Sequence, residues 1–267
     1  MFVRKPAVAD LFYPGDANEL NRYLGSVIKD VQPKVRPKAI IVPHAGYVYS
    51  GHVAAKAYSV IEPFDTYIVM GPNHTGLGAE ISVFDGVYSM PFGAVYPDEE
   101  LIQKISENSY VEIDYYAHLQ EHSIEVQLPF IDYITPNSYR VVTIVVGTHN
   151  ISKLYSVAET IAEAIKSSEK SVLMVVSSDM NHYESHEITL KKDQLVIDAL
   201  SKLDENEMMR VCQYHNITMC GVSPAYIAVS ASKLLGAHKF TVLDHRTSGE
   251  VNGDYSQVVG YLAALIE

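Results

Sequence analysis

The chain has 267 residues, of which 48% are hydrophobic and 19% are charged, so its composition is that of a folded protein and excludes a disordered one. Its formal net charge of −12 argues against nucleic acid or anionic lipid as the main partner. No apolar run approaches the ~20 residues of a membrane span, and the first residues lack the apolar core of a secretion signal. With only two cysteines, Cys212 and Cys220, the sequence predicts a cytoplasmic protein without a disulfide framework.

Short apolar runs alternate along the chain with longer helical patterns. Taken in chain order, the expected elements are a helix over Ala17–Val31, a strand over Ala39–Val42, a helix over Gly51–Ile61, a strand over Thr66–Met70, helices over Asp98–Glu107 and Ser123–Ile134, a strand over Arg140–Val146, a helix over Ile151–Ser167, a strand over Val172–Val176, helices over Glu187–Leu203 and Ser223–Leu235, and a strand over Phe240–Leu243. This alternation predicts an α/β fold with a mostly parallel central sheet and helices on both faces. Because no composition shift marks a linker, we expect residues 1–267 to form a single domain.

A histidine follows the end of each predicted strand within a few residues. These histidines are His44, His74, His149, His182 and His245. Open parallel sheets bind their ligands outside the carboxyl ends of the strands. We therefore expect the histidines to share one edge of the sheet and to form a site there.

The residue types at this edge are typical of a metal site. His44, His74 and Asp179 would supply two histidines and a carboxylate, which is the ligand set of non-haem Fe(II) oxygenases. Zinc could use the same ligands and retain a water for hydrolysis. Asn73, directly before His74, is a candidate binding residue in the same loop.

Two further features lie outside the strand ends. His122 and Glu125 are three residues apart and would share a helix face. The pair could be metal ligands, or an acid–base histidine oriented by its neighbour, or part of a solvent-exposed first helical turn. Cys220 precedes a predicted helix start, and a helix N-terminus lowers the pKa of a thiol, which would suit a nucleophile or a soft metal ligand. The alternative is that Cys220 is a small buried hydrophobic residue.

Several motifs occur in one register along the chain: PHAGYVYSG at 43–51, GPNH at 71–74, EHSIEVQLPF at 121–130, SSDMNHY at 177–183 and CGVSP at 220–224. Together they resemble the MEMO family, named after the mediator of ErbB2-driven cell motility, whose prokaryotic members form the Memo part of an AmmeMemoRadiSam system. The resemblance implies a fold like that of LigB-type class III extradiol dioxygenases. It also implies a functional link to AMMECR1-like and radical SAM proteins.

The resemblance further implies a metal pocket with two histidines and a cysteine as ligands. The histidines correspond to His44 and His74, and an alignment through LDHRTSGEV places Val251 at the cysteine position. On that alignment Asp179 or Glu250 completes the set, and the metal contacts only nitrogen and oxygen, which favours Fe(II) over Cu(I). The dioxygenase likeness assigns His182 as the acid–base residue and places His122 near the substrate.

Three functions follow from these expectations. The first is a metal-dependent redox protein or oxygenase, with Fe(II) favoured and copper or zinc as alternatives. The second is a non-catalytic module that binds a peptide or small anion in the same pocket, lined by Tyr47 and Tyr49. The third is a zinc-dependent hydrolase with His182 or Glu125 as general base.

Overall fold

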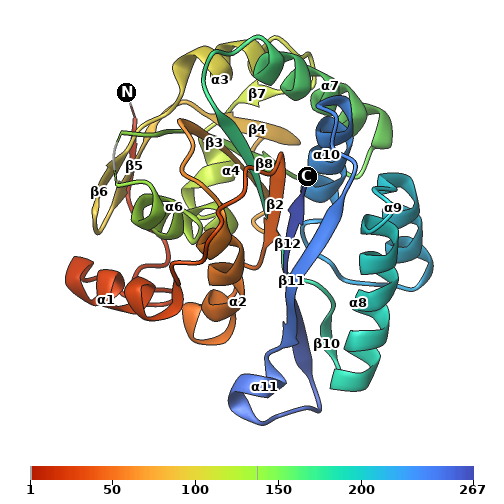
Figure 1. The fold of residues 1–267 in the computed structure, drawn as a ribbon. Helices are drawn as coiled ribbons and strands as arrows, with labels where there is room; N and C mark the ends of the chain where they lie inside the picture. The colour runs from red at the N-terminus through yellow and green to blue at the C-terminus, as the bar shows by residue number, and fades with distance from the viewer. Residues whose placement is uncertain (1, 137) are drawn as a thin grey trace.

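The computed structural model describes residues 2–136 and 138–267 (Figure 1). The strands are β1 (Val3–Arg4), β2 (Ala39–Val42), β3 (Thr66–Pro72), β4 (Ile81–Phe84), β5 (Val87–Met90), β6 (Gly93–Val95), β7 (Glu112–Ile113), β8 (Arg140–Val146), β9 (Val172–Ser177), β10 (His182–Glu184), β11 (Phe240–Thr247) and β12 (Val258–Ile266). The helices are α1 (Ala17–Val27), α2 (Tyr47–Val60), α3 (Glu99–Ser106), α4 (Tyr116–Leu119), α5 (His122–Glu125), α6 (Leu128–Ile134), α7 (Ile151–Lys166), α8 (His186–Leu200), α9 (Glu205–Tyr214), α10 (Val222–Leu234) and α11 (Gly249–Asn252).

The main sheet has a parallel centre and antiparallel edges. Its strand order is β10-β12-β2-β9-β3-β8-β4-β7, with β11 also paired to β12. The central strands β2, β9, β3 and β8 are parallel to one another, whereas β12 runs antiparallel to β2 and β4 antiparallel to β8. The predicted α/β class is confirmed, and the sheet is mixed. Strands β11 and β12 follow each other through a short connection, which permits only the antiparallel arrangement.

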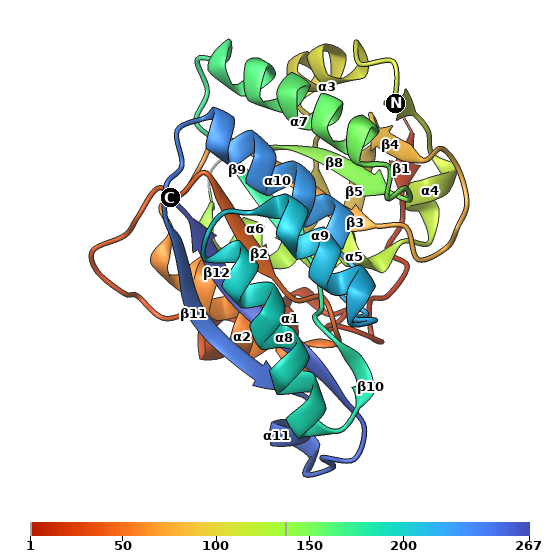
Figure 2. The same cartoon turned by 90° about the vertical axis from the view of Figure 1, so that its right-hand side faces the viewer.

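Helices cover both faces of this sheet, as the alternation of elements predicts. Successive strand residues such as Ile40 and Ile41 point into different cores, because side chains alternate across a strand. One core includes residues of α3, α7, α8, α9 and α10, and the other includes residues of α1, α2 and α6. Figure 2 shows α7, α10, α9 and α8 in front of the sheet and α1 and α2 behind it. No helix in the described residues combines the length and hydropathy needed to cross a membrane.

The N-terminal segment is anchored beside α5 by a buried ion pair. Strand β1 joins β5 and β6 in a small second sheet. Arg4, at the end of β1, lies 2.6 Å from the Glu125 carboxylate, and both side chains are almost fully buried. Glu125 also accepts hydrogen bonds from the backbone of Ala7 and Val8 and from the Tyr13 hydroxyl. These contacts hold residues 4–13 against the end of α5.

Two element predictions need correction. The single helix expected over Ser123–Ile134 is divided into α5 and α6, because Pro129 has no N–H to donate to the carbonyl of Glu125. The strand expected over Phe240–Leu243 continues to Thr247 and pairs with β12, a strand that the sequence analysis did not predict. His245 therefore lies within a strand and not after one.

Candidate metal centre

Three histidines from separate segments converge at the carboxyl ends of the parallel strands. His44 follows β2, His74 follows β3, and His122 begins α5. Their potential ligand atoms all lie within 4.8 Å of one another. The ring centroids are 5.2 Å apart for His44 and His74, 5.4 Å for His44 and His122, and 4.5 Å for His74 and His122.

A close approach between α5 and β3 brings His122 to this position. Gly71 lies in β3 directly against Ser123, the residue after His122. A side chain at position 71 would collide with the Ser123 hydroxyl, so glycine is required for the approach. The Phe12 ring of the anchored N-terminal segment packs against the other side, 4.8 Å from the His122 ring.

The buried surroundings of His44 determine which ring nitrogen carries its proton. Its Nδ1 lies 3.0 Å from the hydroxyl of Ser177, and that hydroxyl donates its own hydrogen to the carbonyl of Ser123. Ser177 must therefore accept from His44, so Nδ1 is protonated and the lone pair is on Nε2. Burial, followed by the neighbouring His122 and His74, lowers the pKa of His44 well below its usual value. A neutral imidazole with a free Nε2 is the form that binds metals.

His74 is oriented in the same way by Glu121. The Glu121 carboxylate accepts from Nδ1 of His74 at 2.8 Å and from the backbone N–H of His74 at 2.7 Å. Burial opposes its ionisation, but these bonds and one from the N–H of Ser123 outweigh burial and lower the pKa of Glu121 to about 2. An ionised carboxylate only accepts, so Nδ1 of His74 carries a proton, and in the neutral ring the lone pair is on Nε2. Metal-bound histidines in proteins typically donate their other ring N–H to such a carboxylate.

Cys220 extends the site on the side of His44. Its Sγ lies 3.3 Å from His44 Nε2 and accepts the backbone N–H of Asp179 at 3.3 Å. Burial, then the nearby Asp179, raises the pKa of the Cys220 thiol, so without a cation it is protonated. A bound cation would favour the thiolate.

The two residues singled out by the expected alignment lie on α11. Val251 is 40% exposed on α11, and Glu250 beside it bonds to Arg246 at 3.0 Å and to the backbone N–H of Thr247 at 3.1 Å. The thiol next to His44 belongs to Cys220, and a metal that contacts only nitrogen and oxygen stays a prediction. The CGVSP motif, which starts at Cys220, was the signal that could have located it.

Asp179 and His182 lie beside the histidines in supporting positions. Asp179 accepts the backbone N–H of His44 at 2.8 Å, and burial raises the pKa of its carboxyl group. His182 donates from Nδ1 to the carbonyl of Thr218 at 2.9 Å, and its backbone N–H bonds to the Thr218 hydroxyl. The second ring nitrogen of His182 is thus a proton acceptor. A role in proton transfer for His182 stays a prediction.

The other candidate residues have structural partners. Tyr47 is buried in the core, and its hydroxyl donates to the carbonyl of Val126, whereas Tyr49 is 39% exposed. The Asn73 side chain stabilises its own turn by donating to the carbonyl of Leu77 and accepting from Gly76.

Glu125, the predicted alternative base, is held in the ion pair with Arg4. Of the remaining strand-end histidines, His149 bonds to Ser223 at 2.7 Å, and His245 bonds to the buried Asp193 at 2.9 Å.

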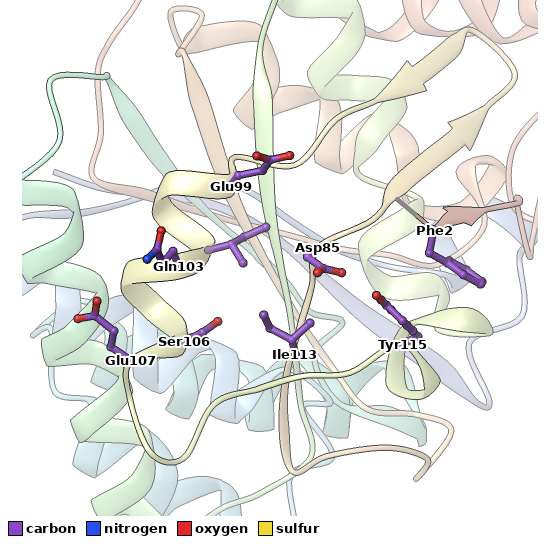
Figure 3. A pocket seen from close by; sticks show the side chains of 9 residues that line it. Phe2, Asp85, Glu99, Gln103, Ser106, Glu107, Ile113 and Tyr115 are labelled. Carbon is purple, nitrogen blue, oxygen red and sulfur yellow. The ribbon is translucent and has the colours of Figure 1, made fainter.

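A cavity elsewhere in the molecule lacks these features. It measures about 570 Å³ and lies between α3 and the segments around Asp85 and Tyr115 (Figure 3). Its lining includes Asp85, Glu99 and Glu107 but none of the histidines among the described residues. This cavity therefore offers no imidazole ligand for a metal.

Comparison with known proteins identifies the family of the chain. The family described as Memo-like protein matches residues 4–265. The chain belongs to this family. A MEMO1 family protein of Aquifex aeolicus is 43% identical over 267 residues and covers 99% of both chains. One from Ignicoccus hospitalis is 40% identical over 280 residues and covers 98% of both.

A solved structure shares the fold at much lower sequence identity. It is the uncharacterized protein JW3007 from Escherichia coli K12, with a TM-score of 0.57 and 12% identity. The match covers 86% of this chain and all of that one. At this identity the likeness establishes the α/β fold alone.

The MEMO-family chain uses residues that the sequence analysis did not assign to the site. Glu121 orients His74, and Ser177 orients His44. Gln127 supports this arrangement by donating to Ser177 and to the carbonyl of Pro43. Glu121 and Gln127 belong to the EHSIEVQLPF motif and Ser177 to SSDMNHY, so the motifs contained the signal but not the pairings.

Proposed function

We propose that this MEMO-family protein binds one redox-active transition-metal ion, Fe(II) foremost, at His44, His74 and His122 and uses it for redox or oxygenase-type chemistry. The observation that carries the proposal is the convergence of three histidine ligand atoms within 4.8 Å. Two of these histidines have their Nδ1 atoms bound to Ser177 and Glu121, so both have the tautomer that a metal requires. Cys220 is placed to add a sulfur ligand beside His44.

The donor set fits a transition metal better than a hard cation. Imidazole suits iron, copper, nickel and zinc, whereas magnesium and calcium prefer oxygen ligands. Bound iron would supply an open coordination position and a reversible one-electron change. His182 would accept or return a proton at Nε2, since its Nδ1 is committed to Thr218. Phe12 would limit access of water on the His122 side.

The two alternative functions have weaker support. A zinc hydrolase needs a general base, and Glu125 is bound to Arg4 and to two backbone N–H groups. A peptide- or anion-binding module was expected to use Tyr47, whose hydroxyl bonds to Val126 in the core. The groups that stay available are His182 for the hydrolase and the exposed Tyr49 for the binding module, so each alternative keeps one of its two expected residues.

Metal content tests the proposal directly. The protein would be purified without oxygen from cells supplied with iron, copper and zinc, and its metals measured by mass spectrometry. We expect about one iron per chain, retained with His238→Ala and lost with His44→Ala or His74→Ala. His238 is a matched control because it is an exposed histidine. Zinc as the main metal in wild type would contradict the iron assignment, and metal retained in both site variants would contradict the site itself.

A further inference from the structure

A second cavity borders the same chain segment that contacts the histidines. It measures about 720 Å³ and lies between the start of α7, helix α9 and the connection from α9 to α10. Figure 2 shows these elements together on the face of the sheet toward the viewer. Thr218 and Cys220 both line it, and the same two residues contact His182 and His44. The cavity and the metal centre therefore share a wall.

The inner surface of this cavity is mostly apolar and adaptable. Ile151, Ile217 and Val222 contribute branched side chains, and Met209 and Met219 contribute flexible thioethers. Cavities of about 300–1,000 Å³ with apolar walls and a few polar groups are typical sites for small molecules. Methionines let such a wall adjust to the shape of its ligand.

The charge of the lining differs from that of the molecule. The chain carries 32 acidic residues and a net charge of −12, but no Asp or Glu is among the described residues that line this cavity. Its charged residue is Arg210, which is 64% exposed and bonds through Nε and Nη2 to Glu207, at 2.6 Å each. That pairing leaves Nη1 for another acceptor. The lining thus offers a guanidinium and no carboxylate among the described residues, which favours a neutral or anionic group over an organic cation.

We propose that this cavity is a second small-molecule site, which takes a compact apolar molecule bearing one carboxylate. The apolar body would contact Met209 and Met219, and the carboxylate would face Arg210. A molecule bound here lies against Cys220 and Thr218 and so adjoins the metal centre without being a metal ligand. The site does not depend on the proposed metal.

Three matched molecules test the chemical class. The metal-free protein, with its methionine methyl groups labelled with ¹³C, would be titrated with 3-phenylpropanoate, 3-phenylpropan-1-ol and 3-phenylpropan-1-amine and followed by NMR. We expect shifts at Met209 and Met219 but not at Met70 or Met174, which are buried in β3 and β9. The acid should bind most tightly and the amine least. Equal or tighter binding of the amine would overturn the proposal.

Variants test the location and the role of Arg210. Arg210→Gln should lower the affinity for 3-phenylpropanoate about two- to fivefold, which is what an exposed ion pair contributes, and leave the affinity for the alcohol unchanged. Gln213→Trp should fill the cavity and weaken all binding by about tenfold or more. Gln194→Trp is its control, since both glutamines are exposed helix residues but only Gln213 lines the cavity.

The outcomes separate this inference from the metal proposal. Undiminished binding in Gln213→Trp would place the molecule elsewhere and overturn the cavity assignment. Binding that appears only after iron is added would identify the metal centre as the site and overturn it as well. If the wild-type protein binds no metal, the proposed function is contradicted and this inference still stands.

Discussion

Two histidine environments in this molecule differ in what the ring nitrogens contact. His118 lies in the N-terminal anchor region, with Nε2 donating to the carbonyl of Ser82 at 3.1 Å and Nδ1 3.3 Å from the Tyr88 hydroxyl. His44 and His74 each bind a protein partner through Nδ1 and direct Nε2 toward the other histidines. His118 stabilises the fold because both of its nitrogens contact groups that do not bind metals, whereas Nε2 of His44 lies beside a thiol that is itself a potential ligand.

The partners behind the histidines differ as well. Arg4 donates from Nε to the carbonyl of His118, and its charge is balanced by Glu125. In the metal centre, the Glu121 carboxylate instead accepts a hydrogen bond from Nδ1 of His74 and so orients that ring. We therefore expect substitutions in the anchor region to change stability and those in the metal centre to change ligand binding.

The largest expected effect is on stability and comes from the replacement of Arg4. Arg4→Met should lower the free energy of unfolding by about 3–5 kcal/mol, because it leaves Glu125 buried without its partner. Chemical denaturation measures this change. The double variant Arg4→Met with Glu125→Gln should recover part of the loss, and an additive result would show that the two residues act independently.

The next effect is a pH dependence that comes from His118. Burial lowers its pKa to about 4, whereas an unfolded histidine titrates near 6.5. Between these values the unfolded state binds the extra proton, so stability falls as the pH is lowered from about 6.5 to 4, by about 3 kcal/mol in total. The difference in unfolding free energy between wild type and His118→Gln, followed across this range, isolates the contribution. A pH-independent difference would exclude it.

A smaller effect is expected at Glu121. Glu121→Gln should weaken iron affinity about 10–100-fold, the usual cost of losing the carboxylate behind a metal-binding histidine. Glu250→Gln is the control, because Glu250 bonds to Arg246 on α11. Competition with a coloured chelator gives both affinities. Equal weakening in the two variants would restore Glu250 as a ligand.

The smallest effect concerns His182. His182→Gln should keep the metal stoichiometry of wild type, because His182 bonds to Thr218 and lies outside the group of converging ligand atoms. Metal analysis of the purified variant provides the measurement. Loss of the metal would make His182 a ligand and extend the metal centre to β10.

Much of the site could be predicted because it depends on local patterns. The apolar runs of β2 and β3 are buried on both faces, and each is followed by a histidine, so the positions of His44 and His74 follow from strand ends and parallel pairing. The bond from Arg246 to Glu250 and the exposure of Val251 on α11 could not be predicted, because the expectation for this segment rested on an alignment alone.

By itself, the sequence determined the α/β class, the helices on both faces and the edge of the sheet where the histidines gather, because hydrophobic periodicity and strand ends are local properties. Only the tertiary structure decided that Cys220, 176 residues from His44 in the chain, lies beside it. It also decided that Glu121 binds His74 and that Glu125 binds Arg4, although the two glutamates are close neighbours in one motif. A side chain's partner depends on which distant backbone packs against it, and that is a property of the assembled core.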